Sequence, residues 1–398
     1  MKICLLAEAF YPIVGGAETH SKLLTQELVD RGHDVVVVTR RVDSSLPAFD
    51  RIEGTDVHRV PPSGYLRLGK YLMIPAAAKA LFQHRQKYDL IYVCGLRVLG
   101  ALGVWMAKLL GKACVLRSES EGELEGAFVR TDFVRRHSVL DGVLAECVQL
   151  RNRLLMQADR FISISSTITE EYVDVGGDER QITTIPNGVD TERFRPPSDS
   201  EKSRMRSKLG LPKKWLLTYT GKLNRGKGLR VLLRAWRELM KQTQDLHLVL
   251  VGSGSGQYLS CEEELRAYVE KNNLDSHVTF TGYVENVEEY LMASDALTLP
   301  SRSEAFGLAL CEAMACGLPC IGTTVGGIPD FVTDGENGLL VAPGDSEALR
   351  DAIWRLYSEE KMAHDLAESA RVTVQEGFSM QAVAEAHVRT FADVLENS

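Results

Sequence analysis

A unit of strand, glycine turn, helix and strand repeats along this chain and limits its possible folds more than any other feature. Residues 2–8 form an apolar run that breaks near Gly15 and Gly16, and residues 17–32 then carry leucines at helical spacing. The run DVVVVTR, residues 34–40, has the continuous apolar character of a strand buried on both faces. Together these segments predict a βαβ unit, in which two parallel strands are joined by a right-handed crossover.

The same pattern continues through both halves of the chain. A polar, proline-bearing segment, residues 190–204, interrupts it and has the composition of a linker. Before this segment, strand-like runs occupy residues 89–95, 112–118, 159–165 and 182–189. After it, similar runs begin at residues 215, 247, 277, 295, 318 and 338.

The sequence therefore predicts an α/β protein with two Rossmann-like, doubly wound parallel-sheet domains. We expect an N-terminal domain over residues 1–195 and a second domain over residues 196–376. Residues 377–398 are expected to form a helix that packs back on the N-terminal domain. Two such domains would face a cleft at the carboxyl ends of their strands, where open α/β sheets bind ligands.

Composition narrows the class further. A chain of 398 residues with 44% hydrophobic and 25% charged residues is typical of a soluble two-domain protein. No apolar run reaches the length of a membrane span, and the start of the chain resembles a strand more than a leader, so we expect a cytoplasmic protein. The eight cysteines form no C-x-x-C pair and no Asp-x-Asp motif occurs, so we predict buried thiols and no bound metal.

The stretch PSRSEAFGLALCEAMACGLPCIGTTVGG, residues 300–327, carries the first candidate site. We expect a helix over residues 308–315, whose first free amides, from Phe306 to Leu308, could bind an anion. Glu304 precedes this helix and Glu312 lies one turn inside it, and carboxylates accept hydrogen bonds well from vicinal hydroxyls. This layout suits a nucleoside diphosphate sugar; the alternative is that Glu304 only caps the helix while Glu312 is solvated.

Two glycine-bearing turns are further candidates. In TGKLNRGKGL, Lys222 and Lys227 follow a predicted strand and could stabilise the charge of a departing diphosphate. Gly15 and Gly16 lead into the first helix and would permit a close approach of the backbone to a phosphate or sugar. The alternatives are a basic surface turn in the first case and a simple turn in the second.

A resemblance to a known family joins these stretches. The chain resembles a retaining glycosyltransferase of family 4, with the GT-B architecture, over nearly its full length. The likeness is carried, in order, by FYPIVGGAETH, IPNGVDTERFRP, GKLNRGKGL, VGSGSG, VTFTGYV, LPSRSEAFGLALCEAMACGLPCIGT, GGIPD and NGLLVAPGD. The resemblance implies that the N-terminal domain binds the acceptor and that the second domain binds the nucleotide-sugar donor.

It also implies individual roles. Glu312 would bind the nucleotide ribose and Glu304 the hydroxyls of the donor sugar, while the backbone at Tyr283 and Val284 would meet the base. Three groups would surround the phosphates: the amides of Phe306, Gly307 and Leu308, the cations Lys222 and Lys227, and, from the other domain, Gly15 and Gly16. Lys222, Lys227 and Glu304 would form the catalytic set.

Two positions depart from the family pattern. Lys222 stands where arginine is usual, and a lysine offers a point charge in place of a bidentate fork. The family commonly has a histidine after the strand that matches KACVLRS, where this chain has Ser118 or Glu119. The role of that histidine is therefore left unassigned.

The resemblance implies transfer of a hexose-type sugar, with retention, from a nucleoside diphosphate sugar, UDP being preferred, to a hydroxyl acceptor. The product would belong to glycolipid or polysaccharide synthesis, and no cofactor, metal or nucleic acid would be needed. The alternatives are a nucleotide-sugar epimerase of the same fold, a phosphorylase, or a catalytically weak protein that binds sugar nucleotides.

Residues 59–88 form a basic interval, which has no acidic residue and mixes cations with apolar side chains such as Leu66, Leu68 and Leu72. This mixture suits peripheral contact with an anionic membrane surface, at the inner face of the plasma membrane, or a lipid-linked acceptor. The alternative is a solvated helix whose apolar side faces the core. The basic residues are Arg59, Arg67, Lys70, Lys79, Arg85 and Lys87.

Overall fold

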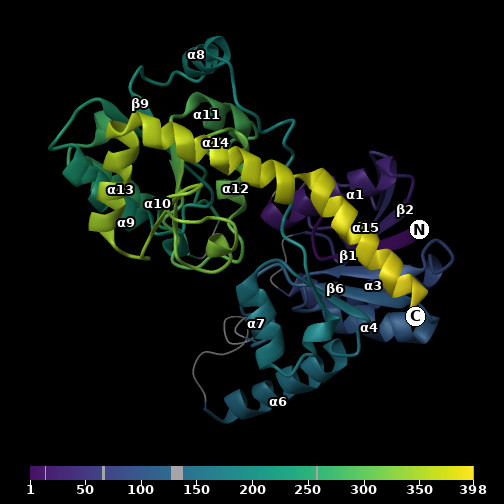
Figure 1. The fold of residues 1–398 in the computed structure, drawn as a ribbon. Helices are drawn as coiled ribbons and strands as arrows, with labels where there is room; N and C mark the ends of the chain where they lie inside the picture. Colours follow the sequence, from purple (N-terminus) through teal and green to yellow (C-terminus); the bar gives the residue numbers. More distant parts are fainter. Residues whose placement is uncertain (14, 65–67, 127–137, 257–258, 398) are drawn as a thin grey trace. The chain divides into compact units, whose positions relative to one another are not determined.

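The computed structural model describes residues 1–13, 15–64, 68–126, 138–256 and 259–397, with the backbone alone for residues 138–144. These residues form two compact units (Figure 1). Unit 1 consists of Met1–Gly188 and Met380–Ser398, and unit 2 of Val189–Ser379. The functional domain boundaries assigned from the sequence, at 195/196 and 376/377, stay predictions.

Unit 1 contains an eight-stranded sheet in the order β3-β4-β2-β1-β5-β6-β7-β8. All neighbouring strands are parallel except β3 and β4, whose antiparallel pairing at the sheet edge the sequence did not indicate. The strands are β1 (Lys2–Ala7), β2 (Asp34–Arg40), β3 (Phe49–Ile52), β4 (Thr55–Val60), β5 (Leu90–Cys94), β6 (Ala113–Arg117), β7 (Arg160–Ser163) and β8 (Ile182–Thr184).

Helices cover both faces of this sheet. On one face, Leu5 and Tyr92 share a buried core with Leu24 of α1 and Phe391 of α15. On the other face α4 lies so close that a Cβ on Gly103 would come within 2.3 Å of Val93 Cγ2. The helices are α1 (Gly16–Asp30), α2 (Gly69–Leu72), α3 (Ile74–Gln83), α4 (Leu99–Leu110), α6 (Ser138–Leu155), α7 (Ser166–Asp174) and α15 (Met380–Glu396).

Unit 2 contains a six-stranded, fully parallel sheet in the order β11-β10-β9-β12-β13-β14. Because every strand runs in the same direction, the segments that follow the strands all leave from one edge of the sheet. The strands are β9 (Trp215–Thr220), β10 (Leu246–Val251), β11 (Val278–Gly282), β12 (Ala296–Thr298), β13 (Cys320–Thr323) and β14 (Leu339–Val341).

Helices also surround the second sheet. Leu216 and Val251 pack with Met205 of α8 and Val287 of α11, while α9 and α13 lie against each other. The sequence of residues 346–372 predicts a single helix, but the structure has two here, because the chain turns at Glu359 (φ −110°, ψ 69°). The helices are α8 (Asp199–Lys208), α9 (Leu229–Leu239), α10 (Glu262–Lys271), α11 (Val287–Ala293), α12 (Leu308–Ala315), α13 (Ser346–Ser358) and α14 (Glu360–Gly377).

The predicted fold class, two doubly wound α/β domains, is confirmed by these sheets and their helices. In the described ranges, no helix combines the length and apolarity needed to cross a lipid bilayer.

Candidate active site

Most candidate residues of unit 2 lie in segments that leave the carboxyl edge of its sheet. Lys222 and Lys227 follow β9, and Glu304 follows β12, the strand that pairs directly with β9. Tyr283 and Val284 follow β11, which lies beyond β10 on the other side of β9. The parallel topology therefore brings residues that are far apart in sequence to one edge.

Lys227 and Glu304 form the central contact of this edge. Lys227 Nζ lies 2.5 Å from Glu304 Oε2, and both side chains are largely buried. Ser301 Oγ donates to the same carboxylate oxygen at 3.0 Å, and the amide of Gly327 donates to the Glu304 carbonyl at 3.2 Å. These contacts hold Glu304 by both its side chain and its backbone, so it is more than a simple helix cap.

The glycine at 228 explains how Lys227 reaches Glu304. Gly228 has a φ of +68°, and a Cβ there would lie 1.8 Å from the carbonyl oxygen of Pro300. Only glycine tolerates both the left-handed backbone and this close approach. The short turn η2 (Arg225–Lys227) is thereby pressed against the segment that follows β12.

Helix α12 begins at Leu308 and ends at Ala315, as the sequence predicts. Gly307 precedes it with a φ of +106°, and the Phe306 ring is buried 5.1 Å from that of Phe331. Phe306 can therefore offer a ligand its backbone but not its ring. In the part of the chain that the structure describes, the amides of Gly307 and Leu308 donate no hydrogen bond. They are available to an anion, as expected at a helix N-terminus.

Glu312 lies in the second turn of α12, and its carboxylate has no hydrogen bond or ion pair among the described residues. Burial raises the pKa of this carboxyl to about 7, against the attraction of Arg193 and with a smaller contribution from Glu288. Arg193 is itself engaged, because its Nη2 donates to Glu288 Oε2 at 2.6 Å. Glu312 is thus an unpartnered carboxyl in a desolvated place, unlike a solvated surface glutamate.

The other candidates of unit 2 are more exposed. Lys222 is exposed, and its carbonyl oxygen accepts a hydrogen bond from Tyr219 Oη at 2.9 Å. Among the described residues its ammonium group forms no ion pair. The Tyr283 side chain is also exposed, whereas Val284 packs against the core beneath α8 and α11. The structure therefore fixes Lys227 and Glu304 as a pair and leaves Lys222 and Tyr283 open to solvent.

In unit 1, Gly15 and Gly16 mark the start of α1. Gly15 precedes the helix with extended backbone (φ −171°), and Gly16 is the first helical residue. A Cβ on Gly15 would lie 2.2 Å from Glu18 Oε2, so a side chain at this position would displace Glu18. The Glu18 carboxylate therefore occupies the space beside the Gly15 backbone, which a side chain at residue 15 would otherwise fill.

Ser118 and Glu119 follow β6 in unit 1. Ser118 Oγ donates to Glu123 Oε2 at 3.3 Å, and the amide of Leu96 donates to the same oxygen at 2.9 Å. Burial raises the pKa of Glu119 to about 8, against the attraction of Arg117 and with a contribution from Glu123. The place of the family histidine is thus a desolvated, carboxyl-rich environment.

Sequence reasoning missed three side chains or amides that shape these sites: Ser301, Gly327 and Glu123. Ser301 and Gly327 lie in the same quoted stretch as Glu304, and this closeness in sequence was the one indication that they could contact it. Glu123 had no comparable signal, since its partners at residues 96 and 118 are brought to it only by the fold.

Two sequence-based expectations concern the candidate metal ligands and the cysteines. Across the described ranges, no group of three or more His, Cys, Asp or Glu side chains converges as a metal site would require. Seven cysteines are buried, but Cys147 is exposed, which corrects the expectation that all eight are buried. Cys147 lies on α6, where the surrounding sequence is apolar but the helix face is open.

Comparison with known proteins now defines the class. Residues 14–193 match the family model described as Glycosyltransferase Family 4, and residues 201–373 match the one described as Glycosyl transferases group 1. Two such halves, each on a parallel α/β sheet, define a glycosyltransferase of the GT-B type. This chain belongs to glycosyltransferase family 4.

Relatives and solved structures agree with this assignment. The chain is 26% identical over 400 residues to N-acetyl-alpha-D-glucosaminyl L-malate synthase of Bacillus anthracis, covering 97% of this chain and 96% of that protein. It is 29% identical over 388 residues to D-inositol 3-phosphate glycosyltransferase of an Arthrobacter species, covering 93% and 88%.

Among solved structures, sucrose-phosphate synthase from Thermosynechococcus elongatus superimposes with a TM-score of 0.81 at 25% identity, covering all of both chains. The HepE protein of Anabaena, solved in complex with UDP-glucose, gives a TM-score of 0.77 at 20% identity over 98% of this chain and 99% of that one. These similarities confirm the GT-B fold.

Proposed function

We propose that this glycosyltransferase moves a hexose-type sugar, with retention at the anomeric carbon, from a UDP-sugar to a hydroxyl acceptor. The observation that carries the proposal is the partly buried Lys227–Glu304 pair, whose members follow the adjacent strands β9 and β12. Glu304 precedes the unpartnered amides at the start of α12 by three residues. The Lys227 ammonium, the Glu304 carboxylate and the α12 amides therefore all lie in segments that leave the same edge of the sheet.

The proposed roles follow from this chemistry. Lys222, Lys227 and the amides of Phe306, Gly307 and Leu308 stabilise the charge that develops on the leaving diphosphate. Glu304 accepts hydrogen bonds from hydroxyls of the donor sugar, and Glu312 does so from the ribose. Tyr283 and Val284 contact the base through their backbone, while Gly15 and Gly16 approach the diphosphate from unit 1.

In the proposed reaction the bond between the anomeric carbon and the diphosphate oxygen breaks. The acceptor hydroxyl forms a new bond on the same face of the sugar, and the departing phosphate takes the hydroxyl proton. No covalent intermediate with a side chain is needed, so catalysis depends on positioning and on charge stabilisation. We propose that no metal is needed, because the lysines and amides supply the charge that a cation would otherwise supply.

The preference for UDP is supported by HepE, a protein of the same fold that was solved in complex with UDP-glucose. The proposed acceptor is a hydroxyl group in glycolipid or polysaccharide synthesis. One relative is named as a glucosaminyl L-malate synthase and another as an inositol 3-phosphate glycosyltransferase, which supports different acceptors within the family.

The test is a coupled assay of UDP release with and without candidate acceptors, with the product's anomeric configuration read by NMR and with EDTA present. Lys227→Ala should reduce kcat by about 100-fold or more, as loss of a charge-stabilising group does in other enzymes. Lys241→Ala is the matched control, because Lys241 is an exposed lysine of the same unit that pairs with Glu238. Near-normal turnover in a folded Lys227→Ala protein, an inverted product, or complete inhibition by EDTA would contradict the proposal.

We further propose peripheral contact of residues 59–88 with an anionic membrane surface. Leu68, Leu72 and Phe82 are exposed there, as are the cations Lys79 and Arg85, which supports the idea. Two cations are engaged elsewhere: Arg59 is buried against Asp50, and Lys87 pairs with Asp56 at 3.0 Å. Arg67, with Tyr65 and Leu66, lies outside the described residues.

Flotation with vesicles that contain anionic lipid tests the membrane proposal. The protein should float at low salt, and Leu72→Glu combined with Phe82→Glu should abolish flotation while UDP-sugar hydrolysis stays unchanged. Absence of flotation by the unmodified protein at low salt would end the membrane proposal without affecting the proposed reaction.

A further inference from the structure

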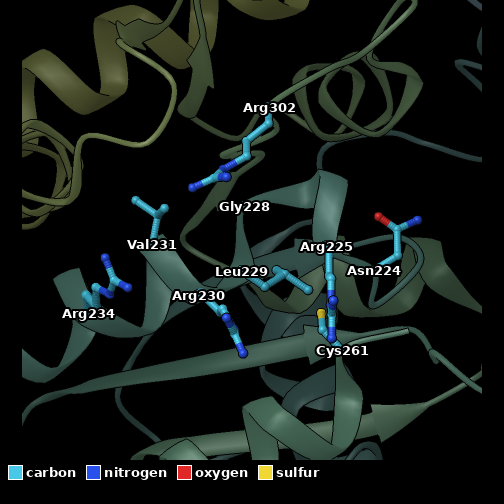
Figure 2. Close-up of a pocket in the computed structure, with 9 residues that line it drawn as sticks. All are labelled: Asn224, Arg225, Gly228, Leu229, Arg230, Val231, Arg234, Cys261 and Arg302. Carbon is cyan, nitrogen blue, oxygen red and sulfur yellow. The ribbon is translucent and has the colours of Figure 1, made fainter. Parts of the chain in front are cut away.

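A small hollow lined by arginines lies in unit 2 beside the turn η2 and the first residues of α9. Its volume is about 170 Å³, below the roughly 300–1,000 Å³ that is typical of pockets for drug-sized ligands. Figure 2 shows the side chains that surround it, including Arg225, Arg230, Arg234 and Arg302. A hollow of this size suits a small ion better than a nucleotide.

The charges around the hollow are strongly unbalanced. Arg225 Nη2 lies 2.6 Å from Glu264 Oε1, and Arg230 pairs with the other oxygen of the same carboxylate. Neither Arg234 nor Arg302 forms an ion pair with any residue that the structure describes. Of the four guanidinium groups that line the hollow, two share the Glu264 carboxylate and two form no ion pair among the described residues, which leaves an excess of positive charge.

The backbone fixes part of this arrangement. The amide of Arg302 donates to the carbonyl of Gly226 at 2.8 Å, which ties the segment after β12 to the turn η2. In Figure 2 the side chains of Arg234 and Arg302 lie on the same side of the hollow as Val231. Like charges gathered on a fixed backbone repel one another, and a bound anion would relieve that repulsion.

The hollow is separate from the candidate active site, although the two share the turn η2. Lys227, at the end of η2, pairs with Glu304, whereas Arg225, at its start, pairs with Glu264 of α10. Neither Lys222, Lys227 nor Glu304 lines the hollow. An anion there would therefore meet a different set of cations from those proposed to hold the donor diphosphate.

We propose that this hollow binds a small phosphate-bearing anion, such as a diphosphate or a phosphate monoester, as a second site on the donor-binding unit. Guanidinium groups match phosphate oxygens with two parallel hydrogen bonds, which explains why arginines and not lysines surround the hollow. Arg234 and Arg302, which form no ion pair among the described residues, bind the anion directly. Arg225 and Arg230 exchange part of their contact with Glu264 for contact with the anion.

Titration calorimetry with inorganic pyrophosphate at constant ionic strength tests this site. The measurements use the full chain carrying Lys222→Ala and Lys227→Ala, so that binding at the candidate active site is weakened throughout. In that background, Arg234→Ala with Arg302→Ala should weaken pyrophosphate binding at least tenfold. Arg237→Ala is the control: Arg237 is on the same helix but pairs with Glu238, so its loss should change the affinity less than twofold.

Two further results bear on the proposal. Adding Arg234→Ala and Arg302→Ala should leave the unliganded melting temperature of the Lys222→Ala, Lys227→Ala protein unchanged, because Arg234 and Arg302 are exposed. If the alanine variants lower the melting temperature, Arg302→Lys replaces them as the test. This variant keeps the positive charge but loses the paired hydrogen bonds of the guanidinium group, so its pyrophosphate affinity should be measurably weaker than that of the protein with Arg302. Equal pyrophosphate affinity with and without Arg234 and Arg302, or no binding in the Lys222→Ala, Lys227→Ala background, would overturn the proposal.

The same phosphate chemistry occurs on lipid headgroups, so a second arm uses vesicles that contain phosphatidic acid. Free pyrophosphate binding without arginine-dependent vesicle binding identifies a soluble ligand. Vesicle binding that is lost with Arg234 and Arg302 identifies a headgroup as the source. If neither pyrophosphate binding nor vesicle binding depends on Arg234 and Arg302, the proposed site is wrong.

Discussion

Glu312→Gln is the substitution whose effect can be worked out most fully. Burial raises the pKa of Glu312 from 4.5 to about 7, so the folded protein binds a proton here that the unfolded chain releases. Stability should therefore fall as the pH rises from about 4.5 to about 7 and remain reduced above that range. One pKa unit corresponds to about 1.4 kcal/mol, so the cost of ionising Glu312 in the folded state reaches at most about 3 kcal/mol.

Glutamine has nearly the same shape as glutamate and cannot ionise, so the variant escapes this cost. At pH 5 the two proteins should melt at similar temperatures. At pH 8 the variant should melt higher, by up to roughly 6–12 °C for a folding unit of this size. Differential scanning calorimetry of the unliganded proteins at both pH values measures the difference.

The same substitution should weaken nucleotide binding, because an amide replaces the carboxylate that is proposed to accept hydrogen bonds from the ribose. We expect about a tenfold or greater loss of UDP affinity at pH 8, typical of hydrogen bonds to a charged group. Glu288→Gln is a useful control, since Glu288 is neutralised by Arg193 and is not proposed to touch the ligand. An equal melting temperature at pH 8, together with unchanged UDP affinity, would refute both the burial argument and the ribose role.

Two further substitutions follow from the geometry. Gly228→Ala should destabilise the protein by about 3 kcal/mol or more, because it combines left-handed strain with a clash against Pro300. Gly210→Ala, at φ +65° with open space around it, should show the strain alone, and equal melting temperatures for the two variants would contradict the clash. Glu119→Gln should stabilise the protein at pH 9 but not at pH 5, because burial raises the pKa of Glu119 to about 8. A melting-temperature difference that does not change with pH would rule this out.

Many helices and strands could be predicted from the sequence because the residues that determine them are contiguous. The apolar run of β2 and the glycines and proline that bound α12 are contiguous in sequence, so their elements could be predicted closely. The antiparallel pairing of β3 could not, because that strand is short and its register depends on β4. The break at Glu359 was missed because the flanking helices have similar composition.

The candidate site could be predicted from the sequence only in part. The residue types at Lys227 and Glu304 could be selected from motifs, but their contact spans 77 positions and depends on the pairing of β9 with β12. The burial that shifts the pKa of Glu312 comes from neighbours that the sequence does not place next to it. The buried position of Arg59 likewise depends on Asp50 from the neighbouring strand, so a sequence-based count of basic residues overstated the free charge.

The central claim is that Lys222 and Lys227 hold the diphosphate of an activated sugar. Titration calorimetry can test it by comparing UDP with uridine, which lacks the diphosphate, on the unmodified protein and on the Lys222→Ala, Lys227→Ala double variant. We predict that the variant loses about 100-fold or more in UDP affinity, the scale of two charge-assisted contacts, while its uridine affinity stays the same. Unchanged UDP affinity, or an equal loss for UDP and uridine, would contradict the claim.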